Sequence, residues 1–235
     1  MFPSQPSRTL VIMAKAPKPG MVKTRLTDCL SFLAATELYR CLLDDTLALA
    51  NSLTGVEVAM MCPEPDREEL VYMLGNRIRI VAQEGAGLAA GLTSVFRRFT
   101  SPEGRLVIAF NSDSPHLPSS NLESAFGILA THDVVIGPTH DGGYYLVGAK
   151  AAHASLFESD AMGTKSALEQ LLTRTKALEL STGFAESFYD IDIASDLTRL
   201  AAELRLAPTR APRTAAWLKE WERATSRLRT GAGSS

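Results

Sequence analysis

Short apolar or β-branched runs alternate along the chain with longer segments of helical periodicity. Runs of this kind indicate strands that pack into a core. They predict six strands, at Thr9–Ala14, Val56–Cys62, Arg77–Ala82, Leu106–Asn111, Asp133–Ile136 and Tyr144–Gly148. Between the first two strands, residues 31–50 predict a helix that begins behind the capping residue Ser31. The residues expected to pack along one face of this helix are Ala35, Tyr39, Leu42, Thr46 and Leu49. Further helices are expected at 66–75, 87–99, 118–130, 164–176 and 194–204.

The alternation of strand and helix predicts the fold class. Consecutive β-α-β units build parallel strands that are joined by right-handed helical crossovers. We therefore expect an α/β protein of three-layer α/β/α architecture with a mostly parallel central sheet. Ligands of such sheets bind outside the carboxyl ends of the strands. The residues that directly follow each predicted strand are therefore the first candidates for chemistry.

The composition allows one large domain with an appended segment. The chain has 235 residues, 46% of them hydrophobic and 21% charged, and a net charge of -2. This balance is typical of a folded protein and argues against disorder or a nucleic-acid scaffold. We expect one domain over residues 1–204 and a basic helix with a flexible tail over 205–235. The second segment stands apart because it holds seven Lys/Arg against two Glu.

An apolar stripe runs along this basic segment. Its members follow helical spacing and are Trp217, Trp221, Ala224 and Leu228. We predict that the stripe packs on the main domain, because such stripes are more often core than interface. A homodimer contact or a helix on an anionic membrane is the alternative.

No segment of the sequence indicates a signal peptide or a membrane span. The longest apolar run near the start, Leu10–Ala14, is far shorter than the roughly 20 residues that cross a bilayer. We therefore expect a cytoplasmic protein with no membrane and no nucleic-acid partner. The cysteines Cys29, Cys41 and Cys62 lack C-x-x-C spacing, which predicts buried thiols and neither disulfides nor zinc.

The loop after the first predicted strand is rich in proline and cations. Pro17, Pro19 and Gly20 shape its backbone, and Lys23 and Arg25 follow them. Cationic side chains on a stiffened loop suit a polyphosphate, to which they donate charge-assisted hydrogen bonds. A solvated basic loop is the alternative interpretation.

Two aspartates are candidate metal ligands. Asp113 follows the fourth predicted strand, where a carboxylate together with substrate phosphates suits Mg²⁺. The alternative for Asp113 is an Asx turn before Pro115. Asp192 is the second candidate, whereas we expect Asp190 to cap the helix that follows it.

A glycine pair marks another candidate segment. Asp141, Gly142 and Gly143 precede the last predicted strand, where they would form either a hairpin turn or a close backbone approach to a ligand. Asp141 could then accept hydrogen bonds from acceptor or ribose hydroxyls. His140 is expected at the surface.

Taken together, these clusters resemble the radical-SAM/selenodomain-associated transferases, glycosyltransferases linked to arsenosugar biosynthesis that belong to the nucleotide-diphospho-sugar transferase superfamily. The resemblance covers roughly residues 8 to 204. It rests on Ala14-Lys15-Ala16-Pro17, Lys23-Thr24-Arg25-Leu26, Ser112-Asp113-Ser114-Pro115, Asp141-Gly142-Gly143-Tyr144-Tyr145-Leu146 and Asp190-Ile191-Asp192.

The resemblance implies a GT-A-like fold, a nucleotide donor, a small-molecule acceptor, and Mg²⁺ or Mn²⁺ held by Asp113 and Asp192. The first loop is also similar to that of phospholactate guanylyltransferases, in which a Lys and an Arg hold the triphosphate and the leaving pyrophosphate. That similarity implies catalytic roles for Lys23 and Arg25 beside Asp113. Further substrate-binding residues by resemblance are Ala14, Lys15, Pro17, Gly87, Leu88, Asp141, Gly142, Gly143 and Thr164.

The chain departs from the family at three places. Residues 87–92 lie where the family shows Asp-Leu-Gly-x-Arg, so the acid and the arginine are missing there. Met162 precedes Gly163-Thr164 where the family has Trp, and Asn111 stands where Gly is common. Thr164 is still expected to cap the next helix.

The superfamily supports two reactions on this scaffold. We favour Mg²⁺-dependent nucleotidyl transfer from an NTP to a small phosphorylated or acidic acceptor, because Lys23 and Arg25 suit the charge of a free triphosphate. A glycosyltransferase with a nucleotide-sugar donor is the alternative. A nucleotide-binding module without catalysis is the third hypothesis, because of the departure at residues 87–92.

Overall fold

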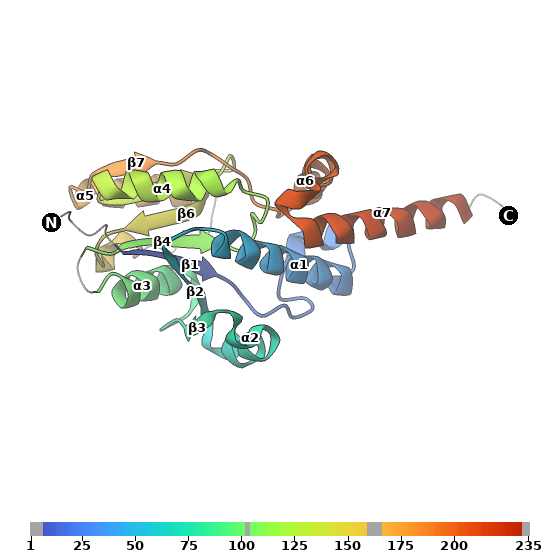
Figure 1. Ribbon diagram of the computed structural model, residues 1–235, viewed down its shortest axis with the longest axis horizontal. Coiled ribbons are helices and arrows are strands. Elements are labelled where there is room, and N and C mark those ends of the chain that lie inside the picture. Colours follow the sequence, from blue (N-terminus) through green and yellow to red (C-terminus); the bar gives the residue numbers. More distant parts are fainter. Residues whose placement is uncertain (1–6, 102–103, 159–165, 232–235) are drawn as a thin grey trace.

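The computed structural model describes residues 7–101, 104–158 and 166–231. Within these ranges, seven strands form one sheet in the order β3-β2-β1-β4-β6-β5-β7 (Figure 1). Only β6 runs antiparallel to its neighbours in this sheet. The strands are β1 Arg8–Met13, β2 Val56–Cys62, β3 Arg79–Ala82, β4 Leu106–Asn111, β5 Val134–Pro138, β6 Tyr144–Ala149 and β7 Thr182–Phe184. The predicted α/β class with a mostly parallel sheet is confirmed.

The helices lie close to their predicted positions. They are α1 Phe32–Asn51, α2 Arg67–Leu74, α3 Gly87–Phe99, α4 Ser119–Thr131, α5 Ala167–Ala177, α6 Ala194–Leu206 and α7 Pro212–Gly231. The predicted cap of α1 is confirmed, because the Ser31 side chain accepts a hydrogen bond from Ala34 N at 3.1 Å. The third strand begins two residues later than predicted, because Gly75–Arg77 form a 3-10 turn after α2.

Strand β7 has no counterpart in the sequence prediction. It contains only three residues and pairs parallel with β5. Its central Gly183 packs so closely on α4 that a side chain there would collide with Ile128. A strand this short, with a glycine at its centre, leaves no alternating pattern for a periodicity argument to detect.

Helices cover both faces of the sheet and produce two separate cores. One face packs against α1, α2 and α4, and its core includes Ile12, Leu47 and Phe126. The other face packs against α3 and α5, where Phe96 and Leu171 are buried. This arrangement gives the expected three layers (Figure 1). A third apolar cluster joins α1, α6 and α7 outside the sheet.

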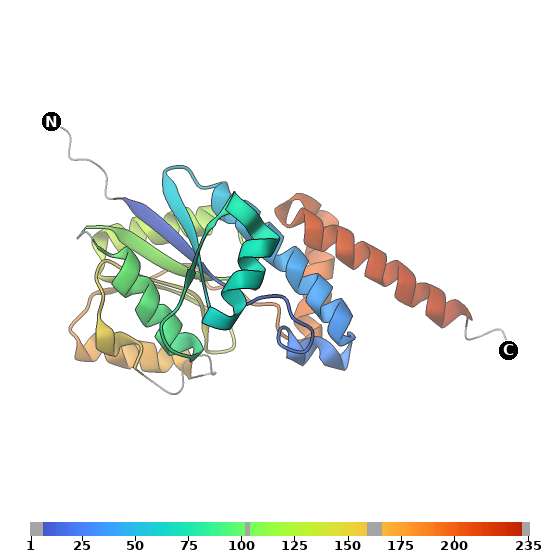
Figure 2. The same ribbon diagram turned by 90° about the horizontal axis from the view of Figure 1, so that it is seen from below.

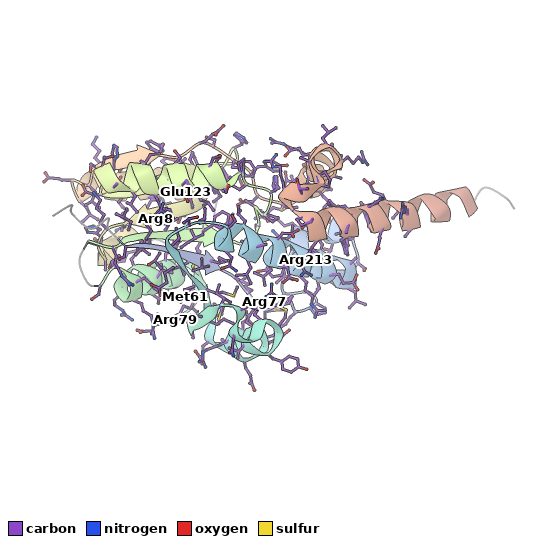
Figure 3. The ribbon with its side chains drawn as sticks, viewed as in Figure 1. Arg8, Met61, Arg77, Arg79, Glu123 and Arg213 are labelled. Carbon is purple, nitrogen blue, oxygen red and sulfur yellow. The ribbon has the colours of Figure 1, made fainter. Side chains whose placement is uncertain are left out.

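The C-terminal helix α7 packs on α1. The buried Asp45 of α1 accepts hydrogen bonds from Thr214 N at 2.8 Å and Arg213 N at 3.2 Å, which satisfies backbone donors at the start of α7. Asp44 pairs with Arg213 Nη1 at 3.6 Å and with Arg77 Nη1 at 3.0 Å, and Figure 3 labels both arginines. The later turns of α7 extend beyond α1, as Figure 1 and Figure 2 show.

The predicted packing of the apolar stripe is confirmed for its two tryptophans only. Trp217 and Trp221 stack with ring centroids 6.1 Å apart and pack on the third cluster. Ala224 is exposed, and the side chain of Leu228 lies outside the described residues. The buried positions of α7 are instead Thr214 and Leu218, so the buried face is rotated from the predicted one.

The three cysteines differ in their exposure. Cys62 is buried, Cys41 is half-buried and Cys29 is exposed, so the prediction of buried thiols is confirmed for Cys62 and wrong for Cys29. Over the described ranges, no helix combines the length and the apolar character needed to cross a membrane.

Candidate functional site

The predicted candidate loops meet at one edge of the sheet. Met13 at the end of β1 pairs in register with Met61 of β2 and Asn111 of β4, so these strands end together. Since Phe110 pairs with Leu146 of the antiparallel β6, the turn before β6 reaches the same edge. After β7 the chain returns past this edge toward α6 (Figure 1). The carboxyl edge of the sheet is therefore the place where the sequence motifs converge.

Lys23 occupies the centre of this edge. Its ammonium nitrogen lies 2.7 Å from Asp113 Oδ1, 3.2 Å from Asp192 Oδ1 and 2.6 Å from the carbonyl oxygen of Ile191. The side chain is only 4% exposed, and these three oxygen partners make its burial possible, because lysine is rarely buried without partners. The structure therefore joins three motifs, from the loops after β1, β4 and β7, around one cation.

The charge of Lys23 follows from these partners. Burial alone would lower its pKa, but the carboxylates of Asp113 and Asp192 outweigh burial and raise the pKa above its ordinary value. Its backbone has φ 49° and ψ 38°, in the left-handed region that a residue with a side chain seldom adopts. Such strain persists only where the surroundings impose it, and here it accompanies an inward-pointing ammonium group.

The oxygen atoms around Lys23 suit a divalent cation. Asp113 Oδ1 and Asp192 Oδ1 lie within 3.2 Å of the same nitrogen. They are thus no more than about 6 Å apart, and a small movement would let both reach one Mg²⁺ with bonds near 2.1 Å. Among the described residues, no group of three or more His, Cys, Asp or Glu side chains could hold a metal. Water and substrate phosphates would have to complete the coordination.

Asp190 supports this edge, which the sequence analysis did not foresee. Its Oδ1 accepts hydrogen bonds from Asn111 Nδ2 at 2.6 Å and from Ser114 Oγ at 2.9 Å. Burial, and secondarily the charge of Asp113, raises the pKa of Asp190 to about 7. The expected capping role of Asp190 is wrong, because the Asp196 side chain accepts from Asp192 N and Ile193 N at the start of α6.

Tyr39 also supports this edge, although helical periodicity predicted for it only a packing role. Its hydroxyl accepts a hydrogen bond from Lys15 N at 3.1 Å and lies 3.0 Å from Ser112 Oγ. The side chain thus ties the loop after β1 to the loop after β4. Burial raises the pKa of Tyr39 to about 12, so the hydroxyl keeps its proton for these contacts. Helical periodicity located the residue correctly but said nothing about its hydroxyl.

The remaining predicted residues of the first loop have different environments. Arg25 is 68% exposed, and its Nη1 lies 3.8 Å from Asp192 Oδ2. Lys15 is exposed, whereas Ala14 and Pro17 are buried. Lys18 pairs with Asp66 at 2.8 Å, which fastens the loop to the start of α2.

Gly87 and Leu88 form the exposed start of α3. Gly87 has φ +84°, a conformation that glycine adopts at little cost. Gln83 donates hydrogen bonds from Nε2 to the carbonyl oxygens of Gly85 and Gly87, at 2.9 and 3.0 Å. A side chain at Gly91 would come within 2.9 Å of Met13 Cε, so α3 approaches the end of β1 closely.

Asp141, Gly142 and Gly143 form the hairpin turn between β5 and β6. Asp141 Oδ1 accepts hydrogen bonds from Thr139 Oγ1 at 2.6 Å and from Gly143 N at 3.3 Å. The hairpin alternative is therefore confirmed, and His140 is exposed as expected. Thr164, together with the expected cap that it provides, lies outside the described residues. The ligand-binding roles of all these positions stay predictions.

The chain is similar in fold to several solved structures. A protein assigned provisionally as a nucleotide-diphospho-sugar transferase, from Desulfovibrio desulfuricans G20, is 25% identical, with 91% of this chain and 94% of that chain covered at a TM-score of 0.83. CMP:2-keto-3-deoxy-manno-octonic acid synthetase complexed with CTP is 14% identical, with coverages of 86% and 99% and a TM-score of 0.54. Rv0371c of Mycobacterium tuberculosis H37Rv, complexed with manganese, is 16% identical, with coverages of 83% and 97% and a TM-score of 0.50.

Sequence comparison identifies a family for this chain but no reaction. No curated protein matches the chain. A family pattern matches residues 46–164, which include β2 to β6 and the Asp113 loop. The chain therefore belongs to the family described as "Uncharacterized protein conserved in bacteria (DUF2064)".

Proposed function

We propose that this chain is a nucleotidyltransferase that uses Mg²⁺ or Mn²⁺ to transfer a nucleoside monophosphate from an NTP to a small phosphorylated or acidic acceptor. The observation that carries the proposal is the convergence of Lys23, Asp113 and Asp192 at the carboxyl edge of the sheet. Charged groups that are fixed at the point where phosphates bind supply most of the catalysis in reactions of this kind.

The proposed reaction needs little acid-base chemistry. An oxygen of the acceptor's phosphate or carboxylate forms a bond to the α-phosphorus, and the bond from that phosphorus to the bridging oxygen breaks. Pyrophosphate then leaves with the electron pair of that bond. Because the acceptor group is already ionised at neutral pH, no general base has to remove a proton from it. Positioning and electrostatic stabilisation of the phosphates are the main tasks left to the protein.

Each predicted residue receives a role in this proposal. Lys23 and Arg25 bind the donor phosphates and stabilise the leaving pyrophosphate. Asp113 and Asp192 hold the divalent ion, which when bound neutralises phosphate charge. Asn111, Ser114 and Asp190 position the loop that carries Asp113, through the hydrogen bonds to Asp190.

The two ends of the edge accommodate the two substrates in this proposal. On the β3 side, Gly87 and Leu88 at the exposed start of α3 contact the donor, and Ala14, Lys15 and Pro17 line the phosphate loop. On the β6 side, the turn of Asp141, Gly142 and Gly143, in which Asp141 is exposed, faces the acceptor. Thr164 stays a predicted acceptor-side residue.

The solved structures of similar fold support the proposal in two respects. One of them is complexed with CTP and another with manganese, so the fold accommodates both kinds of ligand in those proteins. They are too distant in sequence to indicate which base this chain would select. Support for a metal in this chain comes from its own hard oxygen donors, which Mg²⁺ and Mn²⁺ prefer.

Glycosyl transfer from a nucleotide sugar is the second candidate. It is favoured by the D. desulfuricans protein, whose provisional assignment is a nucleotide-diphospho-sugar transferase. The two reactions release different products. Nucleotidyl transfer yields pyrophosphate, whereas glycosyl transfer yields the nucleotide that remains after the donor sugar has left its terminal phosphate. Product identity therefore separates the two candidates.

The decisive experiment combines binding with product analysis. A thermal-shift panel of the four NTPs and common nucleotide sugars, with and without Mg²⁺, would identify the donor by ligand stabilisation. Pyrophosphate release with that donor and a panel of phosphorylated and acidic acceptors would then be measured. We expect Mg²⁺-dependent pyrophosphate release from one NTP. Release of the nucleotide from a nucleotide sugar, with transfer of its donor sugar, would favour the glycosyltransferase instead. Binding without turnover would favour a nucleotide-binding module without catalysis.

A further inference from the structure

The ammonium group of Lys23 lies among the oxygens that are proposed to hold the divalent ion. Asp113 Oδ1, Asp192 Oδ1 and the Ile191 carbonyl oxygen surround Nζ at 2.7, 3.2 and 2.6 Å. A nitrogen with three oxygen neighbours at these distances uses all three protons of the ammonium group. The arrangement is therefore a filled cation site, with lysine as the cation.

We propose that Lys23 is a built-in cation that excludes the divalent ion until a nucleotide arrives. The inference rests on the proposed function, in that it takes Asp113 and Asp192 as the metal ligands. It adds an order of events: the phosphates of the donor draw the ammonium group away, and the ion enters with the donor. Metal binding and nucleotide binding are then coupled through one side chain.

Electrostatics prevents both cations from occupying the site together. An ion bound to Asp113 and Asp192 would have bonds near 2.1 Å, which leaves it only a few ångströms from an ammonium group held by the same oxygens. Two like charges at that distance repel each other. The Lys23 side chain is 4% exposed, and the side chains of Asp113 and Asp192 are 30% and 42% exposed, so solvent screens this repulsion only in part.

Lysine is suited to leave such a site when a better anion is present. Its four-carbon stem is flexible and its ammonium group is a compact charge with three rotatable donors. A triphosphate offers several anionic oxygens to replace those of Asp113 and Asp192. Coupling between two ligands is reciprocal. If the nucleotide strengthens metal binding by removing Lys23 from the carboxylates, the bound metal must strengthen nucleotide binding by the same factor.

Lys18 provides a matched control in the same loop. Its ammonium group pairs with Asp66 Oδ1 at 2.8 Å and with Glu69 Oε2 at 3.6 Å, away from Asp113 and Asp192. Replacing Lys18 removes one positive charge near the site without opening the cation position. A comparison of the two lysines therefore separates direct competition from a general change of charge.

The test measures Mn²⁺ binding to the full chain without nucleotide, by the electron paramagnetic resonance signal of free Mn²⁺. Wild-type protein, Lys23→Gln, Lys23→Arg and Lys18→Gln are compared at one ionic strength. We expect Lys23→Gln to bind Mn²⁺ at least tenfold more tightly than wild type, equivalent to about 1.4 kcal/mol. Lys18→Gln should stay within about twofold, and Lys23→Arg should bind as weakly as wild type because it keeps the charge.

A second titration includes a non-hydrolysable NTP analogue. Wild-type protein should gain at least tenfold in Mn²⁺ affinity, beyond the Mn²⁺ that the analogue binds in a blank titration. Lys23→Gln should gain clearly less, because its cation position is already open. Equal gains in the two proteins would overturn the coupling through Lys23.

Other outcomes also decide the proposal. Equal or weaker Mn²⁺ binding by a folded Lys23→Gln would overturn it. If circular dichroism shows that Lys23→Gln does not fold, wild type and Lys23→Arg carry the test, and micromolar Mn²⁺ binding by either one without nucleotide would overturn it. The experiment needs no turnover, so a chain that shows this competition but transfers no nucleotide would refute the proposed reaction alone.

Discussion

Two buried basic side chains of this protein have opposite charge states. Lys23 and His116 are both almost fully removed from water. Lys23 has three oxygen partners, and although burial lowers its pKa, the carboxylates of Asp113 and Asp192 among these partners raise it above the ordinary value. His116 packs its ring 4.8 Å from Phe188 and 4.7 Å from Tyr189, and neither ring nitrogen has a hydrogen-bond partner among the described residues.

The charge of His116 follows from the absence of close acceptors. Burial, and secondarily the charges of Arg210 and Arg199, lowers its pKa to about 3. Glu203 Oε2 is the nearest carboxylate oxygen, at 3.9 Å from Nε2, which is too far for a hydrogen bond. Burial thus favours the neutral form in both residues, and only the oxygens around Lys23 reverse that preference. The oxygen partners of a buried basic side chain, more than the extent of its burial, therefore decide whether it is charged.

The largest expected effect tests whether the partners of Lys23 serve catalysis. Asp113→Asn keeps the shape of the side chain but removes one of the two carboxylates at the site. We expect turnover to fall at least 100-fold, which corresponds to about 2.7 kcal/mol of transition-state stabilisation. The melting curve should retain one cooperative transition, which would exclude unfolding as the cause. Turnover equal to wild type would remove Asp113 from the mechanism.

The second prediction concerns the stability that the partners provide. Lys23→Met leaves Asp113 and Asp192 close together without a cation. Because these carboxylates are about a third exposed, we expect a loss of about 2 kcal/mol, less than the 3–5 kcal/mol typical of a fully buried pair. Urea unfolding in EDTA at pH 7.5 measures the loss. Lys18→Met removes ion pairs of a more exposed ammonium group and should cost clearly less, and an equal cost for both variants would contradict the contrast.

The third prediction concerns the pH dependence that His116 imposes. The folded pKa is about 3 and the unfolded one is near 6.5. Between these values the unfolded chain binds more protons, so stability falls as the pH falls from 6.5 toward 3. His116→Phe removes this pH-dependent contribution to the free energy of unfolding. From pH 7 to pH 5, wild type should therefore lose about 2 kcal/mol more than the variant.

The measurement for His116 is the difference between the two proteins at each pH. Urea unfolding of both at pH 5, 6 and 7 cancels the contributions of other groups, including Asp190, whose raised pKa gives the opposite slope. A constant difference across this range would mean that His116 is protonated as easily in the folded protein as in the unfolded chain. An overpacking cost of the larger ring would shift all three values equally.

The smallest expected effect concerns the exposed cation of the loop. Arg25 is 68% exposed and approaches Asp192 only to 3.8 Å, so Arg25→Ala should change stability by no more than about 0.5 kcal/mol. We expect kcat/KM for the donor to fall about tenfold, or about 1.4 kcal/mol, because a phosphate contact is lost. Arg40→Ala, an exposed position on α1, is the control. An unchanged kcat/KM for Arg25→Ala would leave the loop as a basic surface.

Much of the fold follows from local patterns in the sequence. Strand β2 and the Ser31 cap of α1 were located correctly, because alternation, periodicity and capping chemistry each act over a few neighbouring residues. The short β7, with Gly183 at its centre, escaped prediction because its position depends on contact with α4. The rotation of the buried face of α7 likewise depends on its contact with α1.

Some residues of the candidate site could likewise be predicted from the sequence, whereas the contacts of others could not. Asp113, Asp192 and Lys23 could be singled out because each follows a strand or belongs to a recognisable motif. Asp190 was assigned to the wrong partner, since sequence spacing offered the nearby helix and could not reveal Asn111, 79 positions away. Tyr39 was placed on the correct face of α1, but its hydroxyl contacts reach residues 24 and 73 positions distant.

By itself, the sequence determined the α/β class, the order of the helices and of every strand except β7 along the chain, and the edge of the sheet where the candidate residues gather. Only the tertiary structure decided that Lys23 meets Ile191 and Asp192, which lie 168 and 169 positions away. The physical reason is that secondary structure responds to neighbours along the chain. The charge of a buried lysine or histidine depends instead on which oxygens the strand order and the return of the chain after β7 bring beside it.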